Sequence, residues 1–229
     1  MKFFKLTLST DEKIIGRYPQ SIEMITIGDW GLKENFQLGY FGPIKNLGRL
    51  PETKIQDNAI ATDIVESAYL RESFFLIMNQ KFVDFLIQFK IPAYELFESP
   101  VHHKKVIHNY KLFHIEYPSN DLFINFRKSE FYIGKRGLPP SDLLVEIHHF
   151  KEYLKRQKQT KLEHPGNNLL CKKLILDLSK CEYDLFRLAV VPALGYFVSE
   201  RLKNSIESKG FTGLDFKEIE EDPKIEVIN

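Results

Sequence analysis

Residues 194–219 read LGYFVSERLKNSIESKGFTGLDFKEI, and they contain the signals for a strand followed by a helix. The run Tyr196-Phe197-Val198 is aromatic and β-branched, which is typical of a buried strand. Ser199 follows directly and is a residue type that accepts a hydrogen bond at a helix N-terminus. Gly210 predicts where that helix ends, because glycine adopts the left-handed C-cap without strain. The inward face of the helix is formed by Leu202 and Ile206, four residues apart.

A second strand follows this helix, and an earlier segment repeats the whole order. Leu214 to Ile219 alternates apolar and polar residues, as a half-buried strand does. Phe74 to Met78 predicts a buried strand, Asn79 a helix N-cap, and Ala93 to Glu98 another strand. We expect 74–98 and 194–218 to form similar strand-helix-strand units, through either duplication or convergent reuse. A shift of 120 residues superposes Asn79 on Ser199, Phe82 on Leu202, Leu86 on Ile206, Ile91 on Phe211, Tyr94 on Leu214, and Leu96 on Phe216.

The remaining sequence predicts short strands and two further helices. Asp57 and Asn58 predict the N-cap of a helix through Ala59, Ile60, Ile64, Val65 and Ala68. Ser141 predicts the start of a long amphipathic helix to Lys161, whose apolar side is Leu143, Leu144, Ile147, Phe150 and Leu154. Strand-like runs are Phe3 to Leu8, Tyr110 to Ile115, Leu122 to Phe126 and Leu174 to Leu178.

These elements predict an α+β fold of mixed sheets with short strands, two strand-helix-strand units and one long amphipathic helix. We expect residues 1–138 to form a β-rich N-terminal lobe with the first unit. Residues 139–229 are expected to form a C-terminal lobe with the long helix and the second unit, and the two lobes to pack as one compact unit. Among the residues expected in the core are Phe186, Phe197, Leu202 and Phe216.

The balance of charge argues against some classes of partner. The chain has 32 basic and 31 acidic side chains, a formal net charge of +1, so no whole-molecule field attracts nucleic acid or an anionic membrane. The basic residues late in the long helix suit the negative end of its dipole and favour a solvated structural face. No apolar run reaches the roughly 20 residues of a membrane span. Lys5 interrupts the only stretch similar to a signal peptide, and we expect a cytoplasmic protein.

The cysteines and histidines predict no metal or redox site. Cys171 and Cys181 have the spacing of neither a disulfide framework nor a CxxC site, which favours two buried free thiols. On one helix, metal chelation needs ligands at i,i+3 or i,i+4, as with His149 and Glu152, and one two-ligand pair is not a metal site. Structural histidines are therefore favoured over metal ligation or acid-base catalysis. The histidines considered are His102, His103, His108, His114, His148 and His149.

The common catalytic and nucleotide-binding motifs are absent from the sequence. The stretch Gly39-Tyr40-Phe41-Gly42 has neither the third glycine of a dinucleotide fingerprint nor the Gly-Lys-Ser/Thr ending of a P-loop. GxSxG and HExxH do not occur. We therefore expect no cofactor, no metal and no catalytic residue, and a protein that is not an enzyme.

Several motifs occur in an order that is similar to the signature of a known family. They are Asp184 to Arg187, Tyr196 to Lys203 and Gly210 to Phe216, preceded by Phe75 to Ile77, Phe82 to Leu86, Tyr110 to Ile115 and Asn125 to Ser129. This order resembles the eleventh class of bacterial polymorphic-toxin immunity proteins, formerly a domain of unknown function. The resemblance covers about the last two thirds of the chain. It implies protein binding and supplies no catalytic residues, and the long basic helix departs from the family's pattern.

The resemblance implies an immunity protein that binds and neutralises a cognate bacterial toxin by stoichiometric occlusion. Aromatic residues often anchor such complexes, so Trp30, Tyr40 and Phe41 are the candidate partner-binding residues; the alternative is that they cover the core. The alternative function is a small-molecule binder or an enzyme whose site is assembled from distant residues. Groups that would converge in such a site are Arg187, His114 and Asp215. The toxin's identity and the oligomeric state stay open.

Overall fold

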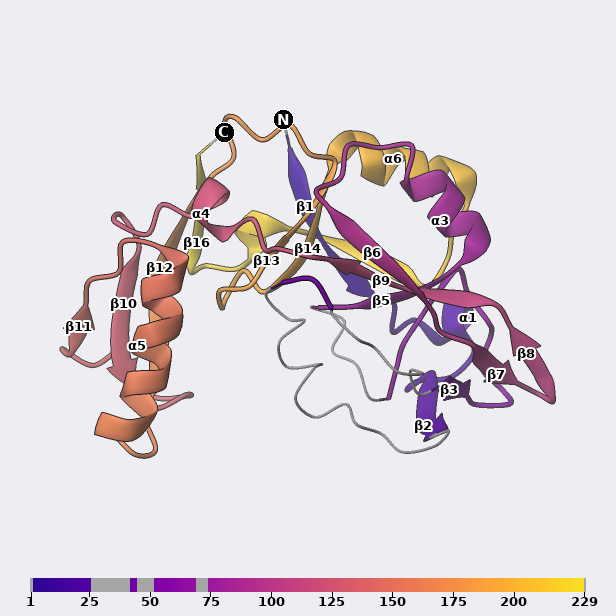
Figure 1. The fold of residues 1–229 in the computed structure, drawn as a ribbon, viewed down its shortest axis with the longest axis horizontal. Coiled ribbons are helices and arrows are strands. Elements are labelled where there is room, and N and C mark those ends of the chain that lie inside the picture. The colour runs from indigo at the N-terminus through magenta and orange to yellow at the C-terminus, as the bar shows by residue number, and fades with distance from the viewer. Residues whose placement is uncertain (1, 26–41, 45–51, 69–73, 229) are drawn as a thin grey trace.

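The computed structural model describes residues 2–25, 42–44, 52–68 and 74–228. The predicted partner-binding residues Trp30, Tyr40 and Phe41 lie outside this described part. Within it, the chain forms five α-helices and sixteen strands in four sheets, each mixed or antiparallel (Figure 1). The predicted α+β fold is confirmed.

Two of the sheets repeat one arrangement. The first has the order β4-β5-β9-β6, and its strands are β4 (Ile64–Val65), β5 (Leu76–Asn79), β9 (Tyr110–Ile115) and β6 (Tyr94–Glu98). The second has the order β13-β14-β1-β15, and its strands are β13 (Leu185–Leu188), β14 (Gly195–Ser199), β1 (Phe3–Leu8) and β15 (Leu214–Glu218). Every neighbouring pair in both sheets is antiparallel.

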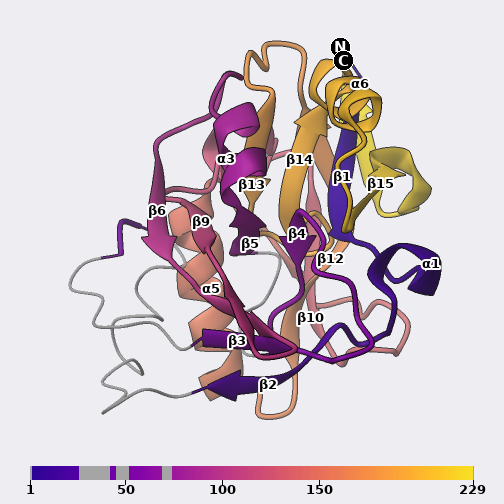
Figure 2. The same cartoon turned by 90° about the vertical axis from the view of Figure 1, so that its right-hand side faces the viewer.

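Each of these sheets contains one strand-helix-strand unit with a strand inserted between its two strands. Helix α3 (Gln80–Leu86) joins β5 to β6, and helix α6 (Glu200–Lys209) joins β14 to β15. The inserted strand is β9 in the first sheet and β1 in the second, so the second sheet takes its inserted strand from the other end of the chain. Figure 2 shows β14, β1 and β15 side by side below α6. The prediction of two similar units is confirmed.

The helix ends follow the sequence signals. The Asn79 side chain accepts a hydrogen bond from the Phe82 N–H at 2.9 Å, and Ser199 accepts one from the Leu202 N–H at 3.2 Å. Gly210 has a φ of 68°, the left-handed conformation that ends α6. The two predicted N-caps and the glycine stop are therefore confirmed.

Two aspartates at matching positions join the units to each other. Asp63 immediately precedes β4, and Asp184 immediately precedes β13. Asp63 accepts a hydrogen bond from the Thr212 N–H (2.8 Å), in the loop after α6. Asp184 accepts one from the Lys90 N–H (3.0 Å), in the loop after α3. Each unit therefore binds the loop that follows the other unit's helix, and the two contacts are reciprocal.

The two units share one apolar core. The rings of Phe113 on β9 and Tyr196 on β14 lie 6.1 Å apart between the sheets. Phe211, in the loop after α6, contacts Phe82 and Phe85 of α3 at centroid distances of 4.9 and 4.8 Å. Figures 1 and 2 both show α3 and α6 as neighbours at the same end of the molecule. The units thus form a single packed body.

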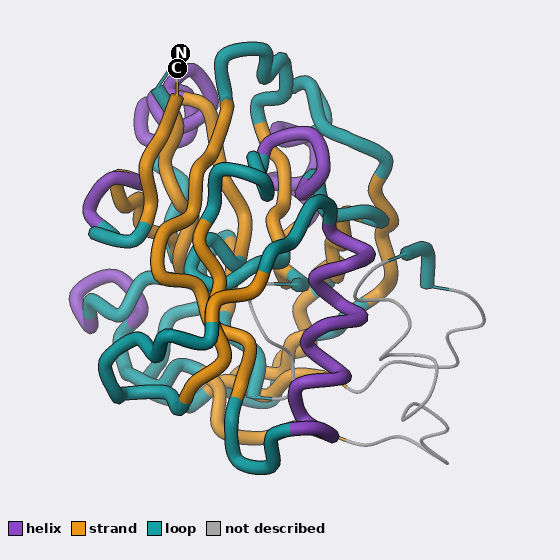
Figure 3. Tube along the Cα trace, turned by 90° about the vertical axis from the view of Figure 1, so that its left-hand side faces the viewer, coloured by secondary structure: helices purple, strands orange, loops and turns teal. Residues whose placement is uncertain are grey.

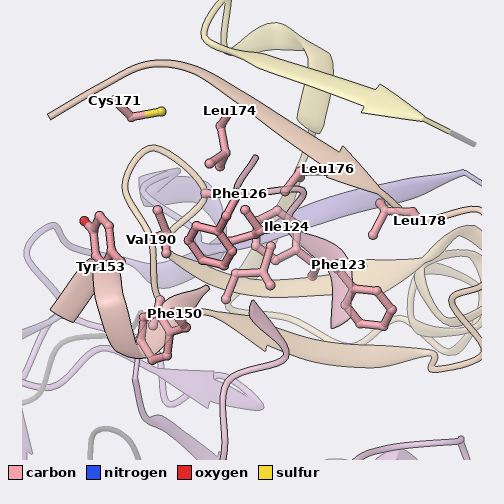
Figure 4. Packing of buried hydrophobic residues seen from close by; sticks show 14 of the residues in the cluster. Phe123, Ile124, Phe126, Phe150, Tyr153, Cys171, Leu174, Leu176, Leu178 and Val190 are labelled. Atoms are coloured by element: carbon pink, nitrogen blue, oxygen red, sulfur yellow. The ribbon is translucent and has the colours of Figure 1, made fainter. Parts of the chain in front are cut away.

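A third sheet covers the other face of the second sheet. Its order is β11-β10-β12-β16, with β11 (Leu144–Val145), β10 (Glu130–Gly134), β12 (Asn168–Asp177) and β16 (Ile225–Ile228). Helix α5 (Phe150–Glu163) packs beside β12 (Figure 3), and α4 (Asn120–Phe123) and the short 3-10 helix η1 (Ile219–Glu221) complete the layer. Figure 4 shows its core, a cluster that includes Phe123, Phe126, Phe150, Leu174 and Leu176.

The fourth sheet is small and lies apart from the third. Its order is β2-β3-β7-β8, with β2 (Ser21–Ile25), β3 (Glu52–Ile55), β7 (Val101–His103) and β8 (Val106–His108); α1 (Glu12–Ile15) lies nearby (Figure 1). Across the molecule, β1 pairs with β14 and β15, and β10 pairs with β12. The sheets therefore join chain segments from both sides of the predicted division at residue 138.

Two of the predicted elements are wrong, the helix after Asp57 and the strand from Leu122 to Phe126. The helix expected after Asp57 is absent, because Ile64 and Val65 pair with Met78 and Ile77 as β4. Strand pairing overrides the weak helical period of this β-branched segment. The strand expected over Leu122 to Phe126 is instead α4 and a single bridge from Ile124 to Leu176.

The long amphipathic helix begins nine residues later than Ser141, at Phe150. Leu144 and Val145 pair with β10 as β11, and Leu143 and Leu144 are exposed instead of facing a core. His149 is the N-cap, so the prediction of a helix from Ser141 is wrong in its first half and right in its second. The sequence from Ser141 to Leu144 is compatible with the start of a helix and with a short edge strand. The pairing with β10 determines that a strand forms.

Three of the four expected core residues are fully buried, namely Phe186, Phe197 and Leu202. Phe216 is only partly buried, and the Lys203 amine lies 5.7 Å from its ring centroid.

None of the helices in the described part of the chain is long and apolar enough to cross a membrane.

The two cysteines are buried free thiols, as the sequence predicts. Burial raises the pKa of Cys171 to about 12 and that of Cys181 to about 11. Because the thiolate is the reactive form, we expect the native protein to react with Ellman's reagent at pH 8 at least about a hundredfold more slowly than the unfolded chain. The absorbance of released thionitrobenzoate measures both rates. Rapid labelling of both thiols in the native protein would contradict this burial.

Candidate protein-binding surface

The β7–β8 hairpin projects from the fourth sheet and ends in a basic turn (Figure 1). Lys104 and Lys105 have φ angles of 49° and 68°, so both turn residues are left-handed, as in the two-residue turn that matches the twist of a hairpin. The register pairs His103 with Val106 and His102 with Ile107. The turn sequence contains neither Gly nor Asn, which is why the turn signals in the sequence do not reveal this hairpin.

The outer strand of this hairpin exposes apolar side chains. Val106 is 55% exposed and Ile107 is 60% exposed, although Val101 on β7, which pairs with His108, is fully buried. Neighbouring residues of a strand point to opposite faces, so β8 presents apolar surface on both of its faces. A shallow groove of about 650 Å³ runs along it, lined by Ile25, Lys54, Asp57, His102, His103, Lys104, Lys105, Val106 and Ile107.

The charge around the hairpin is mainly positive. Lys104 and Lys105 make no ion pair with any residue that the structure describes. Lys54 on β3 is paired with Glu23 at 2.8 Å, with both side chains about half exposed. These amines can therefore attract an acidic partner without first losing a buried ion pair.

One nearby side-chain hydrogen bond connects the base of the hairpin to β3. His102 on β7 contacts the buried carboxylate of Glu52 on β3, and β3 and β7 pair in parallel through Lys54 and His102. The His103 and His108 rings lie 6.1 Å apart on the two strands of the hairpin. His102, His103 and His108 therefore lie in strands of this sheet, in line with the structural role that the sequence favours. No group of three or more possible metal ligands occurs among the described residues.

The residues of the predicted alternative site do not form one site. His114 and Arg187 are both fully buried, whereas Asp215 lies on β15, separated from β13 by two strands. The Tyr196 hydroxyl donates to the Phe74 carbonyl at 2.7 Å, and a His114 ring nitrogen lies 3.3 Å from the same oxygen. The Arg187 guanidinium lies over the Phe74 ring at 5.4 Å.

The protonation states in this buried cluster suit a structural role. Burial raises the pKa of Tyr196 to about 12, so its hydroxyl stays a donor at neutral pH. Burial lowers the pKa of Arg187, but the ordinary value is so high that the guanidinium stays charged. We interpret the cluster as polar packing that positions the start of β5, since Phe74 directly precedes Phe75 and that strand.

A larger groove of about 730 Å³ follows α5, and its polar groups are used to cap the helix. His149 Nδ1 accepts a hydrogen bond from the Glu152 N–H at 3.1 Å, and Glu152 accepts one from the His148 N–H at 2.8 Å. The pair His149 and Glu152, which has metal-type spacing, therefore takes part in the N-terminal cap of α5. The groove is lined both by cations, Lys151, Lys155 and Arg156, and by the carboxylates of Glu146 and Glu152.

Of these surfaces, the hairpin best fits a protein partner, because exposed apolar side chains, a strand edge and two amines without an ion pair to the described residues coincide there. Sequence analysis placed the partner-binding residues in the loop-rich stretch at 30–41 and missed Val106 and Ile107.

No family model matches the sequence, and no significant match was found among curated proteins.

Proposed function

We propose that this protein is an immunity protein, which neutralises a cognate bacterial toxin by forming a stoichiometric complex with it and catalyses no reaction. The observation that carries the proposal is the projecting β7–β8 hairpin, where Val106 and Ile107 are more than half exposed beside Lys104 and Lys105, two turn lysines with no ion pair to any described residue. Burying such apolar side chains against a partner is the main driving force of stable association.

The resemblance to the eleventh immunity class supports the proposal through residues of the scaffold. Its motif positions include the fully buried Phe186 and Phe197 and the helix stop Gly210. A family of this kind keeps its core and turns while the surface that recognises each toxin changes. The hairpin turn Lys104-Lys105 lies outside the motif segments, which suits a surface adapted to one partner.

The test is co-expression of the protein with the toxin encoded beside its gene. We expect cells that carry both to grow, and cells that carry the toxin alone to die or arrest. The purified proteins should form a complex of fixed stoichiometry that buries about 1,200 to 2,000 Å², measured by light scattering and isothermal titration calorimetry. Protection at substoichiometric amounts of this protein would indicate turnover and contradict occlusion. Absence of both binding and protection would overturn the immunity function.

A further inference from the structure

We infer that the hairpin binds its partner by strand addition: an extended acidic segment of the toxin pairs with the free edge of β8. This inference rests on the proposed function and names the mode of recognition at the same surface. In the part of the chain that the structure describes, β8 pairs with β7 alone, so its other edge is available for a new strand.

The register of the hairpin identifies the backbone groups at that edge. In a two-residue hairpin the residues next to the turn, here His103 and Val106, exchange hydrogen bonds with each other. The next pair, His102 and Ile107, is then of the non-hydrogen-bonded kind, so the Ile107 N–H and C=O point away from β7. The pairing of His102 with Lys54 on β3 agrees with this, because His102 also directs its backbone away from β8.

The side chains around this edge favour a peptide of a particular composition. Val106 and Ile107 supply apolar surface on opposite faces of β8, so an added strand can pack apolar residues on both faces. Lys104 and Lys105 place two amines at the turn end of the edge, and the groove continues to the amine of Lys54. Acidic side chains on the added strand would pair with these amines, whereas a basic segment would be repelled.

A peptide fits the surface better than a nucleic acid does. Three nearby lysines could contact phosphates, but a nucleic acid cannot continue a β-ladder through Ile107 or bury Val106 between side chains. Nucleic-acid binding is therefore kept as an outcome of the test. A mixed-sequence single-stranded RNA serves as the probe for it.

Ile107→Pro removes the outward N–H without removing a hydrogen bond inside the hairpin, because the Ile107 N–H does not point to β7. Ile107→Ala is the matched control, since it shortens the side chain but keeps the N–H. We expect Ile107→Pro to weaken toxin binding by at least about tenfold more than Ile107→Ala does, a difference equivalent to one further unpaired backbone donor. Melting temperatures within the wild-type range confirm that each variant is folded.

Amide hydrogen exchange tests the same contact without a variant. In the free protein the Ile107 N–H should exchange quickly, and in the complex with the toxin it should exchange at least about tenfold more slowly. The Val106 and His108 amides, which bond to β7 in both states, serve as internal references. Unchanged exchange at Ile107 in a saturated complex would overturn strand addition even if the proline variant fails to fold.

Charge reversal tests the acidic character of the partner. Lys104→Glu with Lys105→Glu should weaken binding at least about tenfold and reduce its salt dependence. Lys158→Glu with Lys161→Glu on α5 makes the same charge change at an exposed site away from the hairpin and should leave binding within about twofold of wild type. Equal effects of the two pairs would show that only net charge matters and would overturn the inference.

The outcomes separate this inference from the proposed function. If the wild type protects cells and binds the toxin, but Ile107→Pro binds as Ile107→Ala does, immunity stands and strand addition is wrong. If the wild type neither binds nor protects, the proposed function fails, and this inference fails with it. Tighter binding of the RNA probe than of the toxin, lost in the Lys104→Glu, Lys105→Glu variant, would assign the hairpin to nucleic acid instead.

Discussion

Replacing Phe197 with alanine is expected to lower the free energy of unfolding by about 3 to 5 kcal/mol. Phe197 on β14 is fully buried, and its ring stacks on that of Phe186 at a centroid distance of 5.5 Å. Phe186 in turn contacts Phe3 at 5.6 Å and Phe123 at 4.7 Å. The cavity left by the substitution would lie between the second and third sheets. Because their strands are hydrogen-bonded to neighbours, they cannot easily move inward to fill it.

Phe216→Ala provides the matched control for this loss. It removes the same side chain from the same sheet, but Phe216 on β15 is only partly buried, so we expect a loss of about 1 to 2 kcal/mol. Urea denaturation followed by circular dichroism measures both values, with an unchanged m-value as the check on two-state unfolding. A loss under about 1 kcal/mol for Phe197→Ala would show that this ring is not part of the core.

The sequence predicts the two strand-helix-strand units because their signals are local. An N-cap such as Asn79 or Ser199, an apolar face repeated every four residues, and a glycine stop all act within one turn of a helix. The pairing of these units with β1 and β9 is different. The pairing of β1 with β14 places Phe3 opposite Ser199, across nearly the whole chain. No local pattern in β1 specifies β14 as its partner.

The failures of sequence analysis have a common physical cause. Ile64 and Val65, and likewise Leu144 and Val145, form short strands because a neighbouring strand supplies hydrogen bonds to them. Their local sequence also fits a helical period, and tertiary pairing decides between the two. Candidate site residues were harder still to predict, because Val106 and Ile107 resemble core residues in composition. Their exposure follows only from the position of β8 at the edge of its sheet.

The aspartates that join the units show how much a site can depend on a distant partner. No local sequence pattern predicts the contacts of Asp184, yet its side chain accepts hydrogen bonds from the Lys90 N–H, from the Ser199 hydroxyl at 2.8 Å and from Arg201 Nε at 3.0 Å. Its carbonyl also accepts the Ser199 N–H at 2.8 Å. One residue therefore fixes the start of α6 and the loop after α3 together.

Asp184→Ala is expected to destabilise the protein by about 2 to 4 kcal/mol at pH 7, because it leaves the buried Ser199 hydroxyl and the Lys90 N–H without their acceptor. Burial alone would raise the pKa of Asp184, but the hydrogen bonds from Arg201, Ser199 and Lys90 outweigh it and hold the pKa below its ordinary value. A lowered pKa means that the carboxylate stabilises the fold at pH values above the unfolded-state pKa of about 3.9.

That stabilisation is lost as the pH falls through the folded-state pKa, so the difference between wild type and Asp184→Ala should shrink below about pH 4. Urea denaturation of both proteins between pH 7 and pH 3 measures it. A difference independent of pH over this range would mean that the carboxylate charge does not contribute to the contact.

Asp63→Ala is the control, since it removes the matching carboxylate of the other unit. Asp63 accepts hydrogen bonds from the Thr212 N–H, from the Thr212 hydroxyl at 3.1 Å and from the Asn79 amide at 2.9 Å, but it is only partly buried and no arginine of the described residues pairs with it. Water can replace these bonds, so we expect a loss of about 1 kcal/mol, smaller than at Asp184. If Asp63→Ala proved the more costly substitution, the contact after α6 would hold the units together, and the arginine-supported contact after α3 would be secondary.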